Sequence, residues 1–353
     1  MNWIAKKNIN HDYISNKLKS TCEITNQYTN YGSIVKELEH FVKDKFKIDD
    51  SNAVICCNNG TSALYALISG INVFHTSIHG KQIQWATQSF TFPSSAQGML
   101  KDAIIIDINK DGGIDLELIP DNVNGIIVTN CFGNIVDIDK YVNWCKKRNV
   151  FLVFDNAGTA YTFYKGKNSC NYGNGSIISF HHTKPFGFGE GGAIIVDKKY
   201  EYTIRKLMNF GIDNKGSSKY ELYWNQYGNN YKMSEIAAVY ILSYLKDNFD
   251  TIIKHHINIY NHFRRLEKKG KLTLYPNFAD ENMTVPMCIA LLDKTHTEDY
   301  VNSLINNGIY CRKYYCPLIL TKISEYIYTN ILCLPCNVDI YLKSYVTHYN
   351  IIT

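Results

Sequence analysis

Short apolar runs recur along the first half of the chain, and helical patterns or turns separate them. The runs at 53–57, 103–106, 125–128 and 150–154 are apolar almost throughout, which is typical of strands that a sheet buries on both faces. Between the last two runs, residues 138–147 repeat apolar positions at helical spacing, as expected of the crossover that parallel strands require. The pattern predicts an α/β fold built on a mainly parallel sheet.

The length of 353 residues is more than one ordinary core needs, so the sequence predicts more than one domain. We expect a large ligand-binding domain at 1–245 and a smaller α+β domain at 246–353. A long helical stretch from 233 to about 266 links them. The C-terminal part then continues with a predicted strand at 287–292 and a predicted helix at 298–306.

Composition and charge exclude several classes of function. Hydrophobic residues make up 45% and charged residues 20% of the chain, as in ordinary globular enzymes. The net charge of +5 is spread out without a Lys/Arg block, which argues against nucleic-acid binding. The start lacks an apolar leader and no apolar run reaches membrane-spanning length, so we expect a cytoplasmic protein without membrane contact and with reduced cysteines. Cys333 and Cys336 have no second pair or nearby His, so a buried strand or turn is favoured and no metal site is expected.

Asp155 follows directly on the apolar run at 150–154, and the segment 156–158 (Asn-Ala-Gly) comes next. In open α/β sheets, the ligand crevice lies at the carboxyl ends of the strands. A carboxylate in that place can hold a protonated pyridine nitrogen, and it can equally cap the following segment. Asp155 alone leaves both interpretations open.

Lys184 lies just beyond a predicted strand at 176–180, and a glycine-rich stretch at 187–192 leads into a second predicted strand at 192–196. A lysine that forms an imine must lose its proton, so it needs surroundings that disfavour the ammonium. Flanking aromatic residues and glycines fit a tight pocket of this kind, whereas a lone lysine is ordinarily a solvated surface charge. The glycines do not open a helix after a strand, which disfavours a nucleotide loop.

Gly60, Thr61 and Ser62 stand between the strand at 53–57 and a helical pattern that starts at residue 63. Free N–H groups at a helix start, with hydroxyls beside them, suit a phosphate, although a plain helix cap is the commoner reason for such a turn. A phosphate turn, a strand-end Asp and a strand-end Lys, in this order on a parallel sheet, are together typical of a pyridoxal-phosphate (PLP) enzyme. The corresponding fold is that of aspartate aminotransferase, PLP fold type I.

Several segments resemble the DegT/StrS family of nucleotide-sugar aminotransferases, and the similarity extends over nearly the whole chain. The most specific are 179–192, which is similar to the family's lysine motif, and 228–235, which is similar to a segment that reaches into the neighbouring subunit's site. The segments 28–39, 59–64 and 89–92 resemble the substrate loop with the first helix, the phosphate turn, and the segment whose last aromatic residue stacks on the cofactor ring. The resemblance implies PLP as the cofactor and a homodimer with shared active sites.

The resemblance also implies roles for individual residues. Lys184 corresponds to the aldimine-forming lysine that later moves a proton between substrate and cofactor, and Asp155 corresponds to the residue that keeps the pyridine nitrogen protonated. The implied cofactor contacts are Phe92 and Ala157 on the ring faces, and Thr61, Ser62, Ser179 and the partner chain's copy of Asn230 at the phosphate. Implied candidates for substrate contacts are Lys232, Tyr314, Tyr315 and Glu190.

The chain departs from the family pattern at several positions. Where the family commonly has Asp-Ala-Ala-Gln, this chain has Asp-Asn-Ala-Gly at 155–158. The glutamine that would bind the ring hydroxyl is therefore absent, and Asn156 or Thr159 are the candidates for its role. Lys232 stands where the family usually has Arg. One branch of the family has His in place of the lysine and dehydrates sugars, so Lys184 favours amine transfer.

The segments 27–32 and 313–318 resemble those of family members that make 4-amino-4,6-dideoxyglucose, a sugar also called viosamine. We therefore expect transfer of an amino group from L-glutamate to C4 of a 4-keto-6-deoxyhexose on a nucleoside diphosphate. The alternatives are a C3 sugar aminotransferase, a PLP-dependent sugar dehydratase, and a non-catalytic relative that binds PLP or sugar. A non-enzyme has no need of Lys184, Asp155 and Ser179 together, which argues against the last alternative.

Overall fold

A seven-stranded sheet with the strand order β1-β9-β8-β5-β4-β2-β3 forms the centre of the computed structural model, which describes residues 1–212, 228–292, 297–343 and 345. The strands are β1 (Asn52–Cys57), β2 (Trp85–Gln88), β3 (Ile104–Ile106), β4 (Gly125–Thr129), β5 (Phe151–Asp155), β8 (Gly175–Ser179) and β9 (Gly192–Asp197). Strand β9 runs antiparallel to both of its neighbours, and the other neighbouring strands pair in parallel. The predicted α/β fold with a mainly parallel sheet is confirmed.

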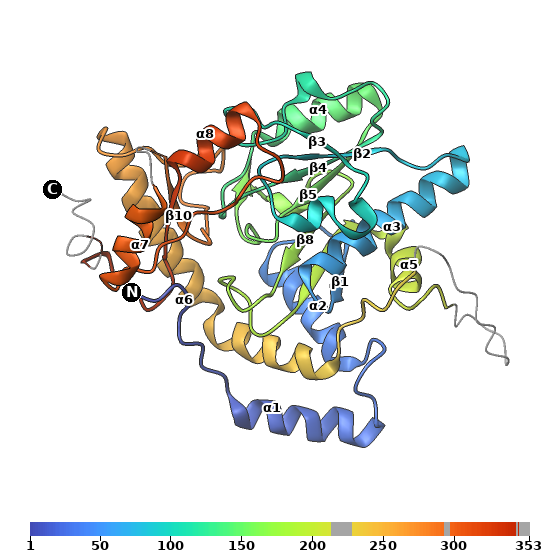
Figure 1. Ribbon diagram of the computed structural model, residues 1–353. Coiled ribbons are helices and arrows are strands. Elements are labelled where there is room, and N and C mark those ends of the chain that lie inside the picture. The colour runs from blue at the N-terminus through green and yellow to red at the C-terminus, as the bar shows by residue number, and fades with distance from the viewer. Residues whose placement is uncertain (213–227, 293–296, 344, 346–353) are drawn as a thin grey trace.

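Helices cover both faces of this sheet (Figure 1). On one face lie α3 (Gly60–His79) and α5 (Lys198–Leu207), and on the other lie α2 (Ser33–Lys45), α4 (Ile138–Arg148) and the first part of α6 (Glu235–Lys268). Successive residues of a strand point to opposite faces, so Ile55 of β1 packs towards α3 while Val54 packs towards α2. Because both faces are covered, a strand such as β1 is apolar along most of its length.

The C-terminal part builds a small antiparallel sheet from β10 (Ile289–Leu291) and β11 (Leu332–Leu334), together with α7 (Glu298–Asn306) and α8 (Lys322–Asn330). Its core includes Phe263 from the second half of α6, which connects this part to the large sheet. Helix α6 continues past residue 245, and the division of the chain into 1–245 and 246–353 stays a prediction. Near the N-terminus, α1 (His11–Leu18) lies beside α6.

Short elements fill the connections. They are the strands β6 (Phe163–Tyr164) and β7 (Lys167–Asn168), a π-helical turn (Lys19–Glu23), and 3₁₀ turns at Pro93–Ala96, Gly98–Leu100, Leu116–Leu118 and Ser169–Asn171. Within the described ranges, the structure contains no helix with the length and apolar character needed to cross a membrane.

The parallel strands end at a common edge of the sheet, and the turns that follow them there carry the polar residues singled out in the sequence. Gly60 begins α3 directly after the two-residue turn that leaves β1, Asp155 ends β5, and Lys184 lies in the loop that follows β8. In the sheet, Asp155 is paired with Thr129 on one side and with Ile177 on the other. A binding site is therefore expected at this carboxyl edge of the sheet.

Candidate active site

A cavity of about 990 Å³ opens at the carboxyl edge of the sheet. The predicted site residues that line it are Thr61, Ser62, Phe92, Asp155, Ala157, Ser179, Lys184, Glu190, Tyr314 and Tyr315. They come from the turns after several strands and from the C-terminal part of the chain, so folding brings distant segments together at one place. The cavity has room for a cofactor and part of a substrate beside it.

Lys184 stands on a tightly bonded loop and projects into the cavity. The loop is closed by backbone hydrogen bonds from Phe180 N to Gly191 O and from His182 N to Gly189 O, each at 2.8 Å. Burial lowers the pKa of the Lys184 ammonium, while the nearby carboxylate of Asp155 acts in the opposite direction. A lowered pKa raises the fraction of neutral amine, which is the form that attacks a carbonyl carbon.

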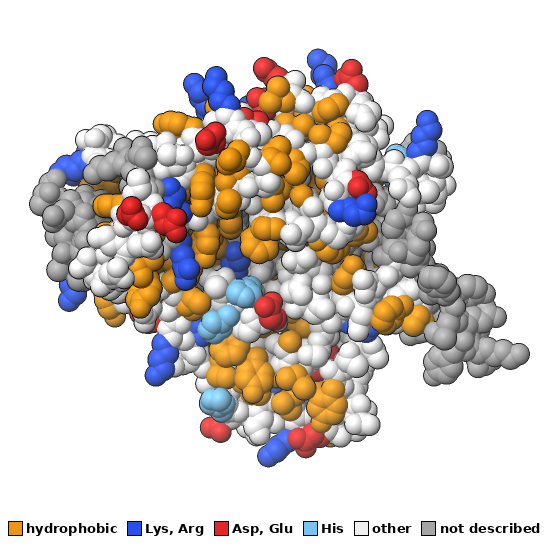
Figure 2. Space-filling model, viewed as in Figure 1, with side chains coloured by type: hydrophobic (Ala, Val, Ile, Leu, Met, Phe, Trp, Pro, Cys, Tyr) orange, Lys and Arg blue, Asp and Glu red, His pale blue; other side chains and the backbone are white. Residues whose placement is uncertain are grey.

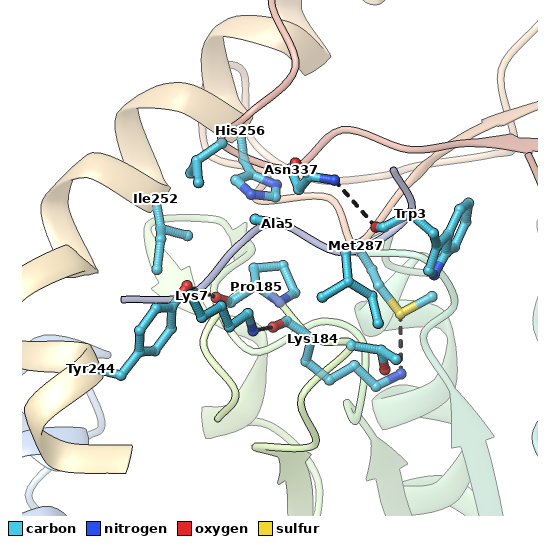
Figure 3. A pocket seen from close by; sticks show the side chains of 13 residues that line it. Trp3, Ala5, Lys7, Lys184, Pro185, Tyr244, Ile252, His256, Met287 and Asn337 are labelled. Atoms are coloured by element: carbon cyan, nitrogen blue, oxygen red, sulfur yellow. Dashed lines mark hydrogen bonds between the residues drawn. The ribbon is translucent and has the colours of Figure 1, made fainter. Parts of the chain in front are cut away.

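The amino group of Lys184 also contacts a residue that the sequence did not single out. Its Nζ lies 3.0 Å from Sδ of Met287, as the dashed line in Figure 3 shows. Met287 comes from the segment just before β10, more than a hundred positions along the chain. A thioether is a weak acceptor, so this contact leaves the amine largely free to react.

Asp155 is a buried carboxylate with few partners, at 2% of its maximal exposure. Its Oδ1 accepts a hydrogen bond from Ala157 N at 2.9 Å. Burial raises the pKa of this carboxyl group, and both the Ala157 N–H and the charge of Lys184 oppose that shift. A cationic N–H donor placed beside Asp155 would relieve the cost of burying the carboxylate.

The N-terminus of α3 forms one end of the cavity. Asn59 caps the helix, with its Oδ1 accepting from Ser62 N at 2.8 Å. The N–H groups of Gly60 and Thr61, the first two helical residues, have no partner within the helix. Ser179 at the end of β8 lies against this turn, since a side chain added at Gly60 would sit 3.0 Å from Ser179 Cβ. Helix N–H groups with hydroxyls beside them make an anion site.

Aromatic side chains form much of the remaining wall. Phe92 is 51% exposed and meets the ring of Tyr315 edge-on, with the ring centroids 6.1 Å apart. Tyr314 stacks on Tyr315 at 5.4 Å, and Trp3 meets Tyr314 edge-on at 5.6 Å. Of these residues, Trp3 was missed by the sequence analysis, because nothing in the local pattern near the start of the chain indicates a cavity.

Two predicted residues lie away from the cavity in this single chain. Asn230 and Lys232 are absent from its lining, although their neighbours Asn229 and Tyr231 belong to it. Lys232 Nζ instead donates to Asn230 Oδ1 at 2.8 Å and to Asn209 Oδ1 at 2.6 Å. A contribution of Asn230 to a partner's site stays a prediction.

The two candidates for the role of the missing glutamine face elsewhere. Asn156 is fully buried, with its Oδ1 accepting from Asn130 Nδ2 at 2.7 Å. Thr159 donates through its hydroxyl to Asn130 O, also at 2.7 Å. Neither lines the cavity, whereas Gly158 and Asn130 do. The position that would carry the glutamine, Gly158, is thus open towards Met287 and Lys184.

Glu190 and His181 form a polar pair at the cavity wall. His181 Nε2 lies 3.5 Å from Glu190 Oε1, and His181 Nδ1 lies 2.8 Å from the Thr183 hydroxyl. The Glu190 side chain is largely exposed, so it can meet a polar ligand without a large desolvation cost.

Elsewhere, Cys333 and Cys336 are buried with free thiols. Cys333 belongs to β11, and Cys336 Sγ lies 3.6 Å from His256 Nδ1. These positions agree with the buried strand and turn expected from the sequence.

The model of the DegT/DnrJ/EryC1/StrS aminotransferase family matches residues 12–340. A dTDP-4-amino-4,6-dideoxy-D-glucose transaminase of Shigella dysenteriae is 26% identical over 341 residues, which cover 89% of this chain and 88% of that protein. A UDP-4-amino-4,6-dideoxy-N-acetyl-beta-L-altrosamine transaminase of Campylobacter jejuni is 29% identical over 217 residues, 57% of this chain and 56% of that protein.

Among solved structures, an aminotransferase of Helicobacter pylori involved in the biosynthesis of pseudoaminic acid superposes with a TM-score of 0.80. The match covers 99% of this chain and 97% of that one at 19% sequence identity. This chain therefore has the fold of PLP-dependent aminotransferases, fold type I, as predicted.

Proposed function

This chain belongs to the DegT/DnrJ/EryC1/StrS aminotransferase family and is a PLP-dependent aminotransferase, and from this premise we propose its reaction. We propose that it moves the amino group of L-glutamate to C4 of a 4-keto-6-deoxyhexose carried on a nucleoside diphosphate. Glutamate leaves as 2-oxoglutarate, and the product is a 4-amino-4,6-dideoxy sugar nucleotide. The observation that carries the proposal is the meeting of Lys184, Asp155 and the α3 N-terminus in one cavity.

The residues present fit the cofactor. The buried Asp155 carboxylate has one backbone N–H partner and a raised pKa, so a protonated pyridine nitrogen supplies the charge that it lacks. The first turn of α3, with Thr61, Ser62 and nearby Ser179, offers N–H and O–H donors for a phosphate. Phe92 and Ala157, which also line the cavity, are the proposed neighbours of the two ring faces.

Lys184 performs two tasks in this proposal. Its neutral amine, favoured by burial, would hold the cofactor through Nζ. Once free again, the same Nζ would move the proton between the substrate carbon that carries the amino group and the carbonyl carbon of the cofactor. When bound, PLP supplies an electron sink for the charge left on the substrate carbon as its C–H bond breaks. Asp155 maintains that sink by holding the ring nitrogen protonated.

The choice of substrate rests on the relatives and on the cavity wall. The Shigella and Campylobacter relatives are named as transaminases of 4-amino-4,6-dideoxy sugars on dTDP and UDP respectively. In this chain, Tyr314 and Tyr315 give the cavity an aromatic wall against which a sugar or base can pack, and Glu190 offers a carboxylate to sugar hydroxyls. A diphosphate requires cationic or N–H donors, for which Lys232 is the proposed source.

We further propose that the active unit is a homodimer with shared sites. Figure 2 shows apolar side chains gathered over the lower part of one face, where the first part of α6 and α1 lie in Figure 1. Exposed apolar residues include Ile24, Tyr28 and Ile236, the last at the start of α6, where Glu235 N donates to Tyr28 O at 3.0 Å. A surface of this kind favours a second copy related by twofold symmetry, with Asn230 reaching the partner's phosphate site.

The reaction is tested with separate substrates. Purified enzyme with PLP and L-glutamate is given the 4-keto and the 3-keto forms of UDP- and dTDP-6-deoxyglucose one at a time, and each product is identified by NMR. Amination of the 4-keto sugars supports the proposal. Turnover of the 3-keto sugars alone would replace C4 by C3, and loss of a hydroxyl without gain of an amine would indicate a dehydratase. Light scattering at the assay concentration tests assembly, because an active monomer contradicts the shared site.

A further inference from the structure

The turn that begins at Lys184 is held from outside by two side chains. Within the turn, Gly187 N donates to Lys184 O at 3.1 Å. Lys7 Nζ donates to the carbonyl oxygens of Lys184, at 2.7 Å, and of Gly187, while the Tyr244 hydroxyl donates to Pro185 O at 3.2 Å. Figure 3 shows Lys7 and Tyr244 approaching the turn from the N-terminal segment and from α6. The backbone of the catalytic lysine therefore depends on donors from two distant parts of the chain.

The N-terminal segment, residues 1–10, is itself anchored on both sides of Lys7. Before Lys7, Asn337 Nδ2 donates to Trp3 O at 3.2 Å. After it, Asn10 N donates to Ser243 Oγ of α6 at 3.2 Å. These two hydrogen bonds hold the backbone on either side of Lys7 in place. Because neither involves the Lys7 side chain, a substitution of that side chain leaves the segment anchored.

Lys7 occupies a place that is unfavourable for a lysine. It lies in a small pocket with Tyr244, Ile252 and His256, and burial lowers the pKa of its ammonium to about 7. Its Nζ is 4.9 Å from the centroid of the Tyr244 ring, and its positive charge helps to lower the pKa of the nearby imidazoles of His182 and His256. A buried amine is costly unless it is hydrogen-bonded, and an apolar side chain would fill the pocket without that cost. What the amine adds is a pair of donors at the Lys184 turn.

We propose that Lys7 is a positioning residue for the reaction, which fixes the backbone turn of Lys184 and thereby the place of its Nζ in the cavity. Tyr244 assists by holding the middle of the same turn and by offering its ring to the ammonium of Lys7. The inference rests on the proposed role of Lys184. Lys7 does not belong to the lining of the large cavity, so in this proposal it acts only through the geometry of Lys184.

The test compares Lys7→Met with Lys6→Met, which removes a neighbouring exposed lysine of the same segment. Apoenzyme is mixed with PLP, and attachment to Lys184 is followed by absorbance and by borohydride trapping with mass spectrometry. Because misplacement of a reacting group by about 1 Å can cost ~100-fold, we expect attachment and kcat to fall ~10-fold in Lys7→Met, with KM for the sugar nucleotide within about twofold. Lys6→Met should match the wild type, and Lys7→Arg, which keeps N–H donors, should recover most of the loss.

Attachment rates for Lys7→Met and Lys6→Met that agree within about twofold would overturn the inference. A fall of kcat together with an equal rise of KM and a lowered melting temperature would show a general structural role instead, which also overturns it. Should Lys7→Met fail to fold, Tyr244→Phe decides, because it removes only the hydroxyl at Pro185 O: slower attachment supports the inference and an unchanged rate opposes it. The attachment step needs no amino transfer, so failure of the proposed function appears separately, as PLP attached to Lys184 in an enzyme that aminates none of the 4-keto sugar nucleotides.

Discussion

Replacing Gly192 with alanine probes the proposed phosphate site without altering a residue that would touch the cofactor. Gly192 begins β9 and is paired with Cys57 and Ser179 in the sheet. A Cβ at this position would lie 2.6 Å from the carbonyl carbon and oxygen of Asn59 and 2.8 Å from Gly60 N, where ordinary contact begins at 3.4 Å. These are backbone atoms in a buried place, so the turn or the strand has to move by roughly 0.8 Å.

The displaced atoms belong to the turn whose N–H groups we propose as donors to the phosphate. A hydrogen bond to a charged group contributes about 1.5–3 kcal/mol, so misalignment of one such bond should weaken binding by about 1.5 kcal/mol, or ~10-fold in Kd for PLP. The same overlap should lower the free energy of unfolding of the apoenzyme by about 1–3 kcal/mol, as overpacking does. At saturating PLP, kcat should change little, because Lys184 and Asp155 stay in place.

A second glycine variant separates affinity from stability. Gly70→Ala lies in the middle of α3, where its Cβ would come 2.4 Å from Ile204 Cγ1, and it stands about ten residues from the turn. Apoenzymes are titrated with PLP by fluorescence quenching and unfolded with urea. Gly192→Ala should show the ~10-fold weaker Kd and Gly70→Ala a Kd within about twofold of wild type, even if both lose stability. Equal PLP affinity in Gly192→Ala and the wild type would refute the placing of the phosphate at this turn.

Other variants test the remaining chemistry. Lys184→Ala should abolish turnover while PLP stays bound through its other contacts, and a variant with near-normal transamination would show that another lysine is the nucleophile. Asp155→Ala should lower kcat at least ~100-fold, as removal of a major electrostatic stabiliser does, whereas a loss below about tenfold would move the ring-nitrogen role elsewhere. Burial lowers the pKa of His256 from 6.5 to about 3, so between these values the unfolded chain binds a proton that the folded chain excludes. As the pH falls through this range, His256 should therefore lower the free energy of unfolding by about 1.4 kcal/mol per pH unit. Urea unfolding of His256→Gln should show a weaker dependence of the free energy of unfolding on pH across that range.

The parts of the fold that could be predicted are those in which local pattern and burial agree. Strand β5 and its terminal Asp155, the loop with Lys184, and helix α4 all follow from apolar runs or helical periodicity. Strand β2 was missed because its sequence, Trp-Ala-Thr-Gln, is half polar. The buried Gln88 is satisfied by its neighbours: its Nε2 donates to Phe90 O at 2.8 Å and its Oε1 accepts from Thr129 N at 2.9 Å. No local sequence pattern predicts hydrogen bonds to such distant residues.

The same limit explains what the sequence could not predict at the site. Strand ends carry Asp155 and Lys184 to a known edge of the sheet, but Trp3, Lys7 and Met287 reach it from segments whose position is set only by tertiary packing. Asn156 was a reasonable candidate for a cofactor contact by its place in the sequence, yet its side chain is turned towards Asn130. The direction in which a polar side chain points from a turn depends on its hydrogen-bond partner, and the sequence does not show which residue that partner is.

The anchoring of the N-terminal segment sets an order of events during synthesis. The amide of Asn337 donates to the carbonyl of Asn2 at 2.8 Å, a contact between residues 335 positions apart. Asn2 is therefore synthesised 335 residues before its partner exists, and contacts of such separation form late in folding. Until then, the N-terminal segment is not anchored, and Lys7 is not held in place to donate hydrogen bonds to the turn of Lys184. Nascent chains that have already formed the large sheet should accordingly be slow to take up PLP, which delays activity until the C-terminal part has folded.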